Sequence, residues 1–172
     1  MEKFDILNSS YEKTGRIGNR YDKLYEGEFR KVVHLCIFNS KGEMLIQKRN
    51  QKKNTWPGRW DVTCGGAVIA GETVLEALKR ELYEELGLTI DLKDVRPGLS
   101  IHYYEGVDET FLIEKDVDLN DIRFNDNEVE DVKYVSKEEL LEKFDNDEFV
   151  FYKRSFLEVF FDFYKDRNHY TD

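Results

Sequence analysis

The stretch from residue 65 to residue 88 constrains this chain most, because two glycines lead into a loop and then into a strongly acidic helical pattern. From Thr73 onward, apolar residues recur at steps of three and four, which predicts a helix with one buried face. Gly87 follows the last of them and is typical of a helix C-cap. The apolar positions are Val74, Ala77, Leu78, Leu82 and Leu86.

Three glutamates share one face of this predicted helix. Glu81, Glu84 and Glu85 stand at offsets of zero, three and four residues, and side chains at those offsets converge. Three like charges repel one another and would destabilise an isolated helix, whereas Mg²⁺ needs several oxygen ligands. The spacing therefore favours a site for a hard divalent cation, with a solvated acidic helix face as the alternative.

The residues around these glutamates fit the same interpretation. Arg80 can orient a carboxylate or neutralise part of the negative field. Glu72, near the start of the helix, can satisfy N-terminal donors or brace the loop. Gly65 and Gly66 let the backbone come close to the acids, so a carbonyl there can also reach a cation.

The whole segment resembles the Nudix box: glycine, five residues, glutamate, seven residues, then Arg-Glu-aliphatic-any-Glu-Glu-any-Gly-aliphatic. All nine fixed positions match, namely Gly66, Glu72, Arg80, Glu81, Leu82, Glu84, Glu85, Gly87 and Leu88. The resemblance implies a Mg²⁺-dependent or Mn²⁺-dependent hydrolase in which water attacks a phosphorus of a nucleoside diphosphate derivative or another small diphosphate. It implies Glu81, Glu84 and Glu85 as metal ligands, joined by the carbonyl of Gly65. Glu81 can act as general base, although the base varies in this family.

Residues 32–135 also resemble a narrower branch, the Nudix hydrolases similar to isopentenyl diphosphate isomerase. The resemblance includes the basic loop before Trp56-Pro57-Gly58. It implies Arg49 and Lys53 as the residues that bind the diphosphate, and a solvated basic loop is the alternative.

The residues that an isomerase needs are absent from their expected positions. Its catalytic cysteine falls at Gly65, one place after Cys64, and its metal-binding histidines fall at Lys23, Arg30 and Ala67. The box, in contrast, is intact. We therefore expect hydrolysis, with an isomerase-type enzyme or a non-catalytic nucleotide-sensing module as alternatives.

Two acids outside the box are further candidates for a metal ligand or general base. Glu109 matches an isomerase glutamate by spacing, and Glu128 precedes a predicted strand; an exposed surface acid is the alternative for each. His34 lies within an apolar strand and is interpreted as a packed core residue. The helical aromatic stripe is interpreted as core or as a dimer face; it comprises Phe156, Phe160, Phe163 and Tyr164.

Strands and helices alternate, which predicts an α/β (α+β) fold; in the Nudix family this is a mixed sheet packed between helices. Strands are expected at 32–39, 43–48, 95–104, 110–114 and 129–135. Short helical segments are expected after residue 136 and over 151–164. The 172 residues are expected to form one Nudix domain, with 1–30 as an N-terminal extension that contains a strand at 4–7 and a turn segment over 16–25.

Composition limits the partners. A formal net charge of −10 argues against a nucleic-acid polymer and leaves a small diphosphate-containing substrate. No apolar run of about 18 residues occurs, so no membrane partner is expected. Two cysteines form no disulfide framework, which favours the reducing cytoplasm. A homodimer is common among relatives and is carried as an expectation.

Overall fold

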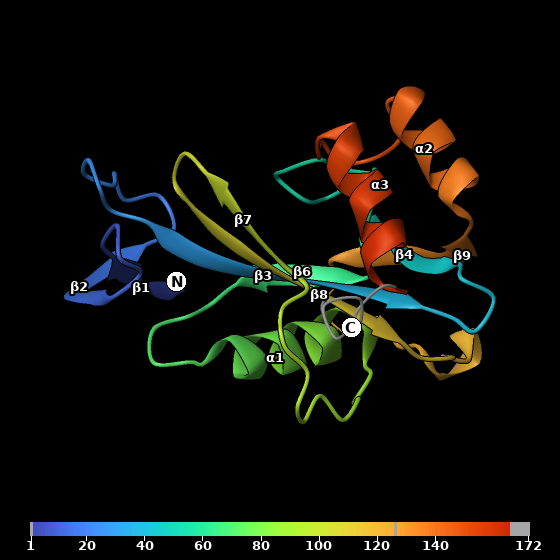
Figure 1. Ribbon diagram of the computed structural model, residues 1–172, viewed down its shortest axis with the longest axis horizontal. Coiled ribbons are helices and arrows are strands. Elements are labelled where there is room, and N and C mark those ends of the chain that lie inside the picture. The colour runs from blue at the N-terminus through green and yellow to red at the C-terminus, as the bar shows by residue number, and fades with distance from the viewer. Residues whose placement is uncertain (1, 126, 166–172) are drawn as a thin grey trace, which may run out of the picture.

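The computed structural model describes residues 2–125 and 127–165 (Figure 1). The strands are β1 (Lys3–Leu7), β2 (Lys13–Asn19), β3 (Arg30–Phe38), β4 (Met44–Arg49), β5 (Trp60–Asp61), β6 (Cys64–Ala67), β7 (Leu99–Tyr103), β8 (Gly106–Glu114) and β9 (Val129–Val135). The helices are α1 (Val74–Leu86), α2 (Lys137–Asp145) and α3 (Arg154–Phe163), with a 3₁₀ turn at Leu119–Asp121. The order of strands and helices confirms the predicted α+β class.

The main sheet is mixed and seven-stranded, and β3 lies at its centre. On one side β3 pairs in parallel with β8, which pairs antiparallel with β7 at the edge. On its other side β3 pairs with two antiparallel strands in turn, β4 near its C-terminal end and β6 along its N-terminal half. β4 also pairs with β9 and β5. The sheet therefore splits beside β3, and β6 forms one side of the split.

A buried threonine satisfies the backbone at this split. The amide of Ile37 donates to the hydroxyl of Thr63 over 2.9 Å, and that hydroxyl donates in turn to the carbonyl of Leu45. Thr63 is fully buried, so both backbone groups would otherwise lie unpaired away from water. One side chain thus lets the chain pass from pairing with β4 to pairing with β3.

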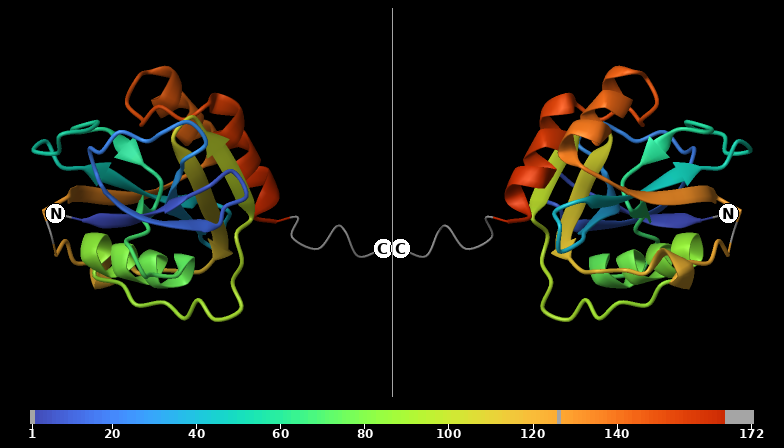
Figure 2. Two further views of the ribbon diagram at one scale, coloured as in Figure 1. Left: turned by 90° about the vertical axis from the view of Figure 1, so that its left-hand side faces the viewer. Right: turned by 90° about the vertical axis from the view of Figure 1, so that its right-hand side faces the viewer.

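Helices cover both faces of the sheet, with α1 on one side and α2 and α3 on the other (Figures 1 and 2). Side chains alternate along β3, so Val33, Leu35 and Ile37 pack toward α1 while Cys36 and Phe38 pack toward α2 and α3. The apolar stripe predicted for α1 is the stripe that is buried. These two apolar layers hold α1 beside β6.

Helix α1 begins and ends where the sequence predicts. Thr73 is the N-cap and Gly87 the C-cap, the latter with a left-handed φ of 68° that favours glycine. The capping box pairs Thr73 with Glu76, however, and not with Glu72. Of the two roles considered for Glu72, the structure therefore supports the bracing of the loop.

Several predicted boundaries are wrong. The strand expected at 95–104 is only β7, since the residues before it form turns around Pro97, and β8 begins four residues before the expected Thr110 because its whole length pairs with β3. The last helix begins at residue 154, since the chain just before it bonds to Trp60 through the amide of Val150. The N-terminal turn segment expected at 16–25 is instead β2, paired with β1.

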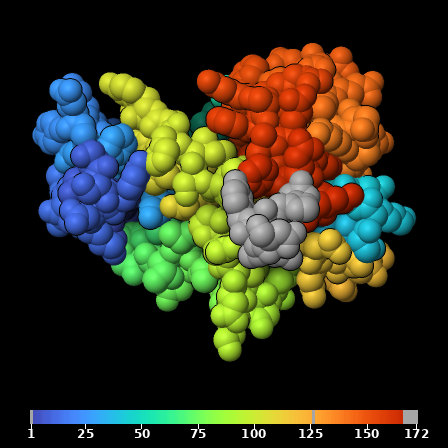
Figure 3. All heavy atoms as spheres, in the orientation of Figure 1, coloured from blue at the N-terminus to red at the C-terminus, as the bar shows by residue number. Residues whose placement is uncertain are grey.

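The N-terminal strands and the β7–β8 hairpin form neighbouring projections at one end of the molecule (Figure 3). None of the helices in the described part of the chain is long and apolar enough to cross a membrane.

Candidate active site

The site is organised around β6, whose outer edge faces away from β3. The amide of Val68 donates to the carbonyl of Lys31, so the alternation of an antiparallel ladder makes Gly66 a hydrogen-bonded position and turns the backbone of Gly65 outward. The contacts agree: the amide of Gly65 donates to Oε2 of Glu85 over 3.2 Å. The carbonyl of Gly65 points to the same side, toward α1, and is not used by the ladder.

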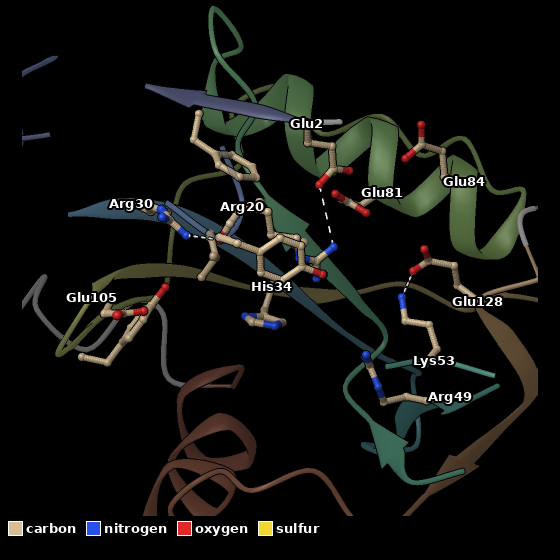
Figure 4. Close-up of a pocket in the computed structure, with 17 residues that line it drawn as sticks. Glu2, Arg20, Arg30, His34, Arg49, Lys53, Glu81, Glu84, Glu105 and Glu128 are labelled. Atoms are coloured by element: carbon tan, nitrogen blue, oxygen red, sulfur yellow. Dashed lines mark hydrogen bonds and ion pairs between the residues drawn. The ribbon is translucent and has the colours of Figure 1, made fainter. Parts of the chain in front are cut away.

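Both glycines of β6 are required by what packs on them. A Cβ on Gly66 would overlap Oε1 of Glu81, and a Cβ on Gly65 would overlap Cδ2 of His34. Successive residues of a strand point to opposite faces. The α1 carboxylate and the imidazole therefore approach the same strand from its two faces, as the labelled side chains in Figure 4 show.

Arg80 gathers the acids of the box. Its Nε donates to Oε1 of Glu72 over 2.8 Å, and its Nη1 donates to Oε1 of Glu81 over 2.7 Å and to Oε2 of Glu84 over 3.0 Å. Nη2 donates to the carbonyl of Ala67 over 2.9 Å. The hydrogen bond to Glu72 and the nearby carboxylates raise the pKa of Arg80. Arg80 thus joins the loop, β6 and α1 through one guanidinium.

Glu85 is the most deeply buried acid of the site. Its side chain is 2% exposed and accepts hydrogen bonds from Nε2 of Gln47 over 2.9 Å and from Gly65. Burial, and then repulsion by Glu81, raises the pKa of Glu85 to about 8. Burial also raises the pKa of Glu81. Two neighbouring carboxylates are therefore held where ionisation is costly unless a cation joins them.

The donor set fits a hard divalent cation. Glu81 and Glu85 supply carboxylates, Gly65 an outward carbonyl, and, within the described part of the chain, Oε1 of Gln47 is buried without a hydrogen-bond partner. Oxygen donors of these kinds are those that Mg²⁺ accepts. Over residues 2–125 and 127–165, however, no three His, Cys, Asp or Glu side chains are already gathered for a metal. Glu84, the third predicted ligand, is held by Arg80 instead.

The two basic residues predicted to bind diphosphate lie across the cavity from α1. Nη1 of Arg49 donates to Oδ2 of Asp61 over 3.1 Å, and its Nε donates to the carbonyl of Thr55 over 3.1 Å. Asp61 also accepts from the hydroxyl of Tyr152 over 3.1 Å, which fixes Arg49 from behind. Lys53 forms an ion pair with Glu128.

These groups line one cavity of about 380 Å³ (Figure 4). The structure brings together Arg49, Lys53, Gly65, Gly66, Glu81, Glu84 and Glu128, all of which were predicted from the sequence. It does not place Glu109 there: among the described residues, Glu109 accepts from Oγ of Ser100 over 2.6 Å and does not line the cavity. The far end of the cavity is lined by Glu2, Phe4, Arg20, Tyr21, Arg30, Tyr103 and Glu105, which no motif indicated.

The interpretation of His34 as a packed core residue is wrong. Its ring lines the cavity, and its Nδ1 lies 2.7 Å from Oδ2 of Asp108. Burial opposes the charged ring, but the carboxylate of Asp108 outweighs it and raises the pKa of His34 to about 9. The sequence signal was a histidine in an apolar strand, but its partner lies 74 residues away and depends on the parallel register of β3 and β8.

A mixed, split sheet between helices, with Nudix-box carboxylates on the helix beneath a glycine edge, defines a Nudix-type fold and site. The comparisons agree: the NUDIX domain model matches residues 28–155. An uncharacterised Nudix hydrolase of Listeria monocytogenes is 45% identical over 152 residues, which cover 88% of this chain and 90% of that protein. The chain therefore belongs to the Nudix family and is a Nudix hydrolase.

Two further similarities define its place in the family. A solved structure of a Deinococcus radiodurans protein superposes with a TM-score of 0.76 at 27% identity, covering 95% of this chain and all of that one. An isopentenyl-diphosphate Delta-isomerase of Saccharopolyspora erythraea is 38% identical over 102 residues, covering 56% of this chain and 50% of that enzyme. The predicted resemblance to the isomerase branch is thus confirmed.

Proposed function

We propose that this Nudix hydrolase is Mg²⁺-dependent and cleaves a diphosphate linkage in a nucleoside diphosphate derivative or another small diphosphate, by attack of water on phosphorus. The observation that carries the proposal is the arrangement of one cavity with buried acids on the α1 side and fixed cations opposite. An acidic protein of net charge −10 can hold a polyanion only with such local help.

Each residue has a distinct part. Glu81, Glu85 and the carbonyl of Gly65 would hold the cation, with Glu84 joining when its ion pair with Arg80 loosens. When bound, the cation would polarise phosphoryl oxygens and offset the charge that develops on the leaving group. Mn²⁺ has the same ligand preference and would serve as well.

Arg49 and Lys53 would bind the diphosphate oxygens. The guanidinium of Arg49 is already oriented by Asp61, whereas Lys53 must exchange its partner Glu128 for a phosphate. Two carboxylates that line the cavity, Glu81 and Glu128, are the candidates for the base that takes the proton of the attacking water.

The position of Cys64 favours hydrolysis over isomerisation. Cys64 is fully buried in the apolar layer against α1, and burial raises the pKa of its thiol well above the usual value. The place of the isomerase cysteine is Gly65, where the ring of His34 leaves no room for a side chain. The described cavity therefore offers no thiol to protonate or deprotonate a carbon.

The test is a hydrolysis screen over a panel of diphosphate compounds with Mg²⁺ or Mn²⁺, with products read by mass spectrometry. Glu85→Gln should lose turnover by at least a hundredfold, while Glu138→Gln, an exposed glutamate of α2, should match the wild type. Turnover by Glu85→Gln would refute the metal site. Tight nucleotide binding without hydrolysis would support a sensing module, and migration of a double bond would support an isomerase.

The N-terminal extension is proposed to belong to the same single domain, since it supplies Glu2, Phe4, Arg20 and Tyr21 to the cavity. Limited proteolysis should then remove no stable fragment around residue 30 before the whole domain is cut. We also propose a cytoplasmic enzyme that acts as a homodimer without binding nucleic-acid polymers. Analytical ultracentrifugation tests the dimer.

A further inference from the structure

His34 and Asp108 form an ion pair on the face of the sheet opposite α1. Asp108 is 7% exposed, and both of its oxygens are engaged: Oδ2 lies 2.7 Å from Nδ1 of His34, and Oδ1 accepts from the hydroxyl of Thr110 over 3.2 Å. The hydrogen bonds fix the carboxylate, and the carboxylate fixes the plane of the imidazole. The arrangement holds one ring nitrogen and leaves the other to the cavity.

The second nitrogen, Nε2, lies beside Gly65. A Cβ on Gly65 would meet first Cδ2 and then Nε2 of His34, so this edge of the ring rests on the strand. The backbone of the same glycine faces Glu85 on the other side. Figure 4 shows His34 on one side of the strand and Glu81 on the other. A diphosphate that reaches the α1 acids therefore passes within reach of the imidazole.

The charge of the pair determines what Nε2 can offer. A carboxylate as buried as that of Asp108 persists in the ionised form only beside a cation, and His34 is its ion-pair partner. With one proton shared with Asp108, the imidazolium carries the other on Nε2, where it can donate to a ligand.

We propose that His34 binds the substrate diphosphate by donating from Nε2 to a phosphoryl oxygen, and that Asp108 is its positioning residue. This inference rests on the proposed function and adds a third cationic contact to those of Arg49 and Lys53. It explains why β6 needs glycine at position 65: a larger residue would displace the ring from the diphosphate path. The oxygen is held from the face opposite the α1 acids.

The probe is methylenediphosphonate, a diphosphate that cannot be hydrolysed, added with Mg²⁺ to the ¹⁵N-histidine-labelled protein. The chain has three histidines, so single substitutions assign the imidazole signals. We expect the Nε2 signal of His34 to shift with saturation, while that of His102, an exposed residue of β7, stays in place. By calorimetry, His34→Gln should weaken the probe about tenfold to a hundredfold. His102→Gln is the matched control and should not change its affinity.

Asp108→Asn tests the positioning role. It should move the Nδ1 signal of His34 in the free protein and weaken the probe, although the ring remains. Probe binding that leaves the His34 signals unmoved, or an unchanged Kd for His34→Gln, would overturn the inference. So would failure of the wild type to bind the probe. A shift of His34 in a protein that hydrolyses no diphosphate would support the inference and refute the proposed function, so the two failures are distinguishable.

Discussion

Ionisation of Glu85 should make the cation-free protein less stable as the pH rises. The pKa of this carboxyl rises from an ordinary 4.5 to about 8 in the fold, because of burial first and then repulsion by Glu81. The unfolded chain therefore releases this proton near pH 4.5, and the folded chain only near pH 8. The stabilisation of the protonated form is complete below pH 4.5 and is lost as the pH rises toward 8.

The magnitude follows from the shift. One pKa unit corresponds to about 1.4 kcal/mol, and with a raised value of about 8 the loss between pH 5 and pH 7 amounts to about 2.5 kcal/mol. Glu85 is 2% exposed, so solvent screening reduces this figure little. Glu85→Gln keeps the shape of the side chain and an oxygen to accept from Gln47 and Gly65, but has no proton to lose.

The assay is urea unfolding in a chelator at pH 5, 6, 7 and 8, followed by the fluorescence of buried Trp60. The quantity compared is the difference in unfolding free energy between wild type and Glu85→Gln, which removes the titration of other groups. This difference should shift by about 2.5 kcal/mol in favour of the variant between pH 5 and pH 7. Glu138→Gln should show no such shift. Parallel pH profiles for wild type and Glu85→Gln would refute the reasoning.

Three further variants test other parts of the structure. Gly65→Ala should collide with the imidazole packed on β6 and cost about 1–3 kcal/mol of stability, measured by urea unfolding; an unchanged midpoint would show that the strand has room. Thr63→Val removes the hydroxyl that satisfies backbone groups of β3 and β4, and should cost about 1–3 kcal/mol in the same assay. Lys53→Met should raise KM for the diphosphate substrate about tenfold in steady-state kinetics, whereas Lys52→Met, its exposed neighbour, should not. Equal KM values for those two variants would exclude Lys53 from substrate binding.

The parts of the site that sequence predicts are those whose residues are close in the chain. Helix α1, its caps and the convergence of Glu81 with its neighbours follow from offsets of three and four residues and from Gly87. The box pattern added the loop glycines, and the basic loop supplied Arg49 and Lys53. Each of these depends on local geometry, which the order of residues specifies.

The parts that sequence misses depend on register between distant strands. Asp108 and Glu109 are neighbours, and spacing alone selected Glu109, but alternation along β8 turns Asp108 toward His34 and Glu109 toward Ser100. Only the pairing of β3 with β8 decides which one faces the cavity. The split beside β3, which exposes the edge of β6, is likewise a long-range property.

The outward amide of Gly65 gives the enzyme an internal reporter of its own site. Amides along a ladder are protected from hydrogen exchange by the strand beside them, and open when that pairing opens. The Gly65 amide is bonded to the Glu85 carboxylate instead. Its exchange rate therefore depends on how firmly that carboxylate is held. A single backbone signal would then register cation loading at equilibrium, in the intact enzyme and without any substrate.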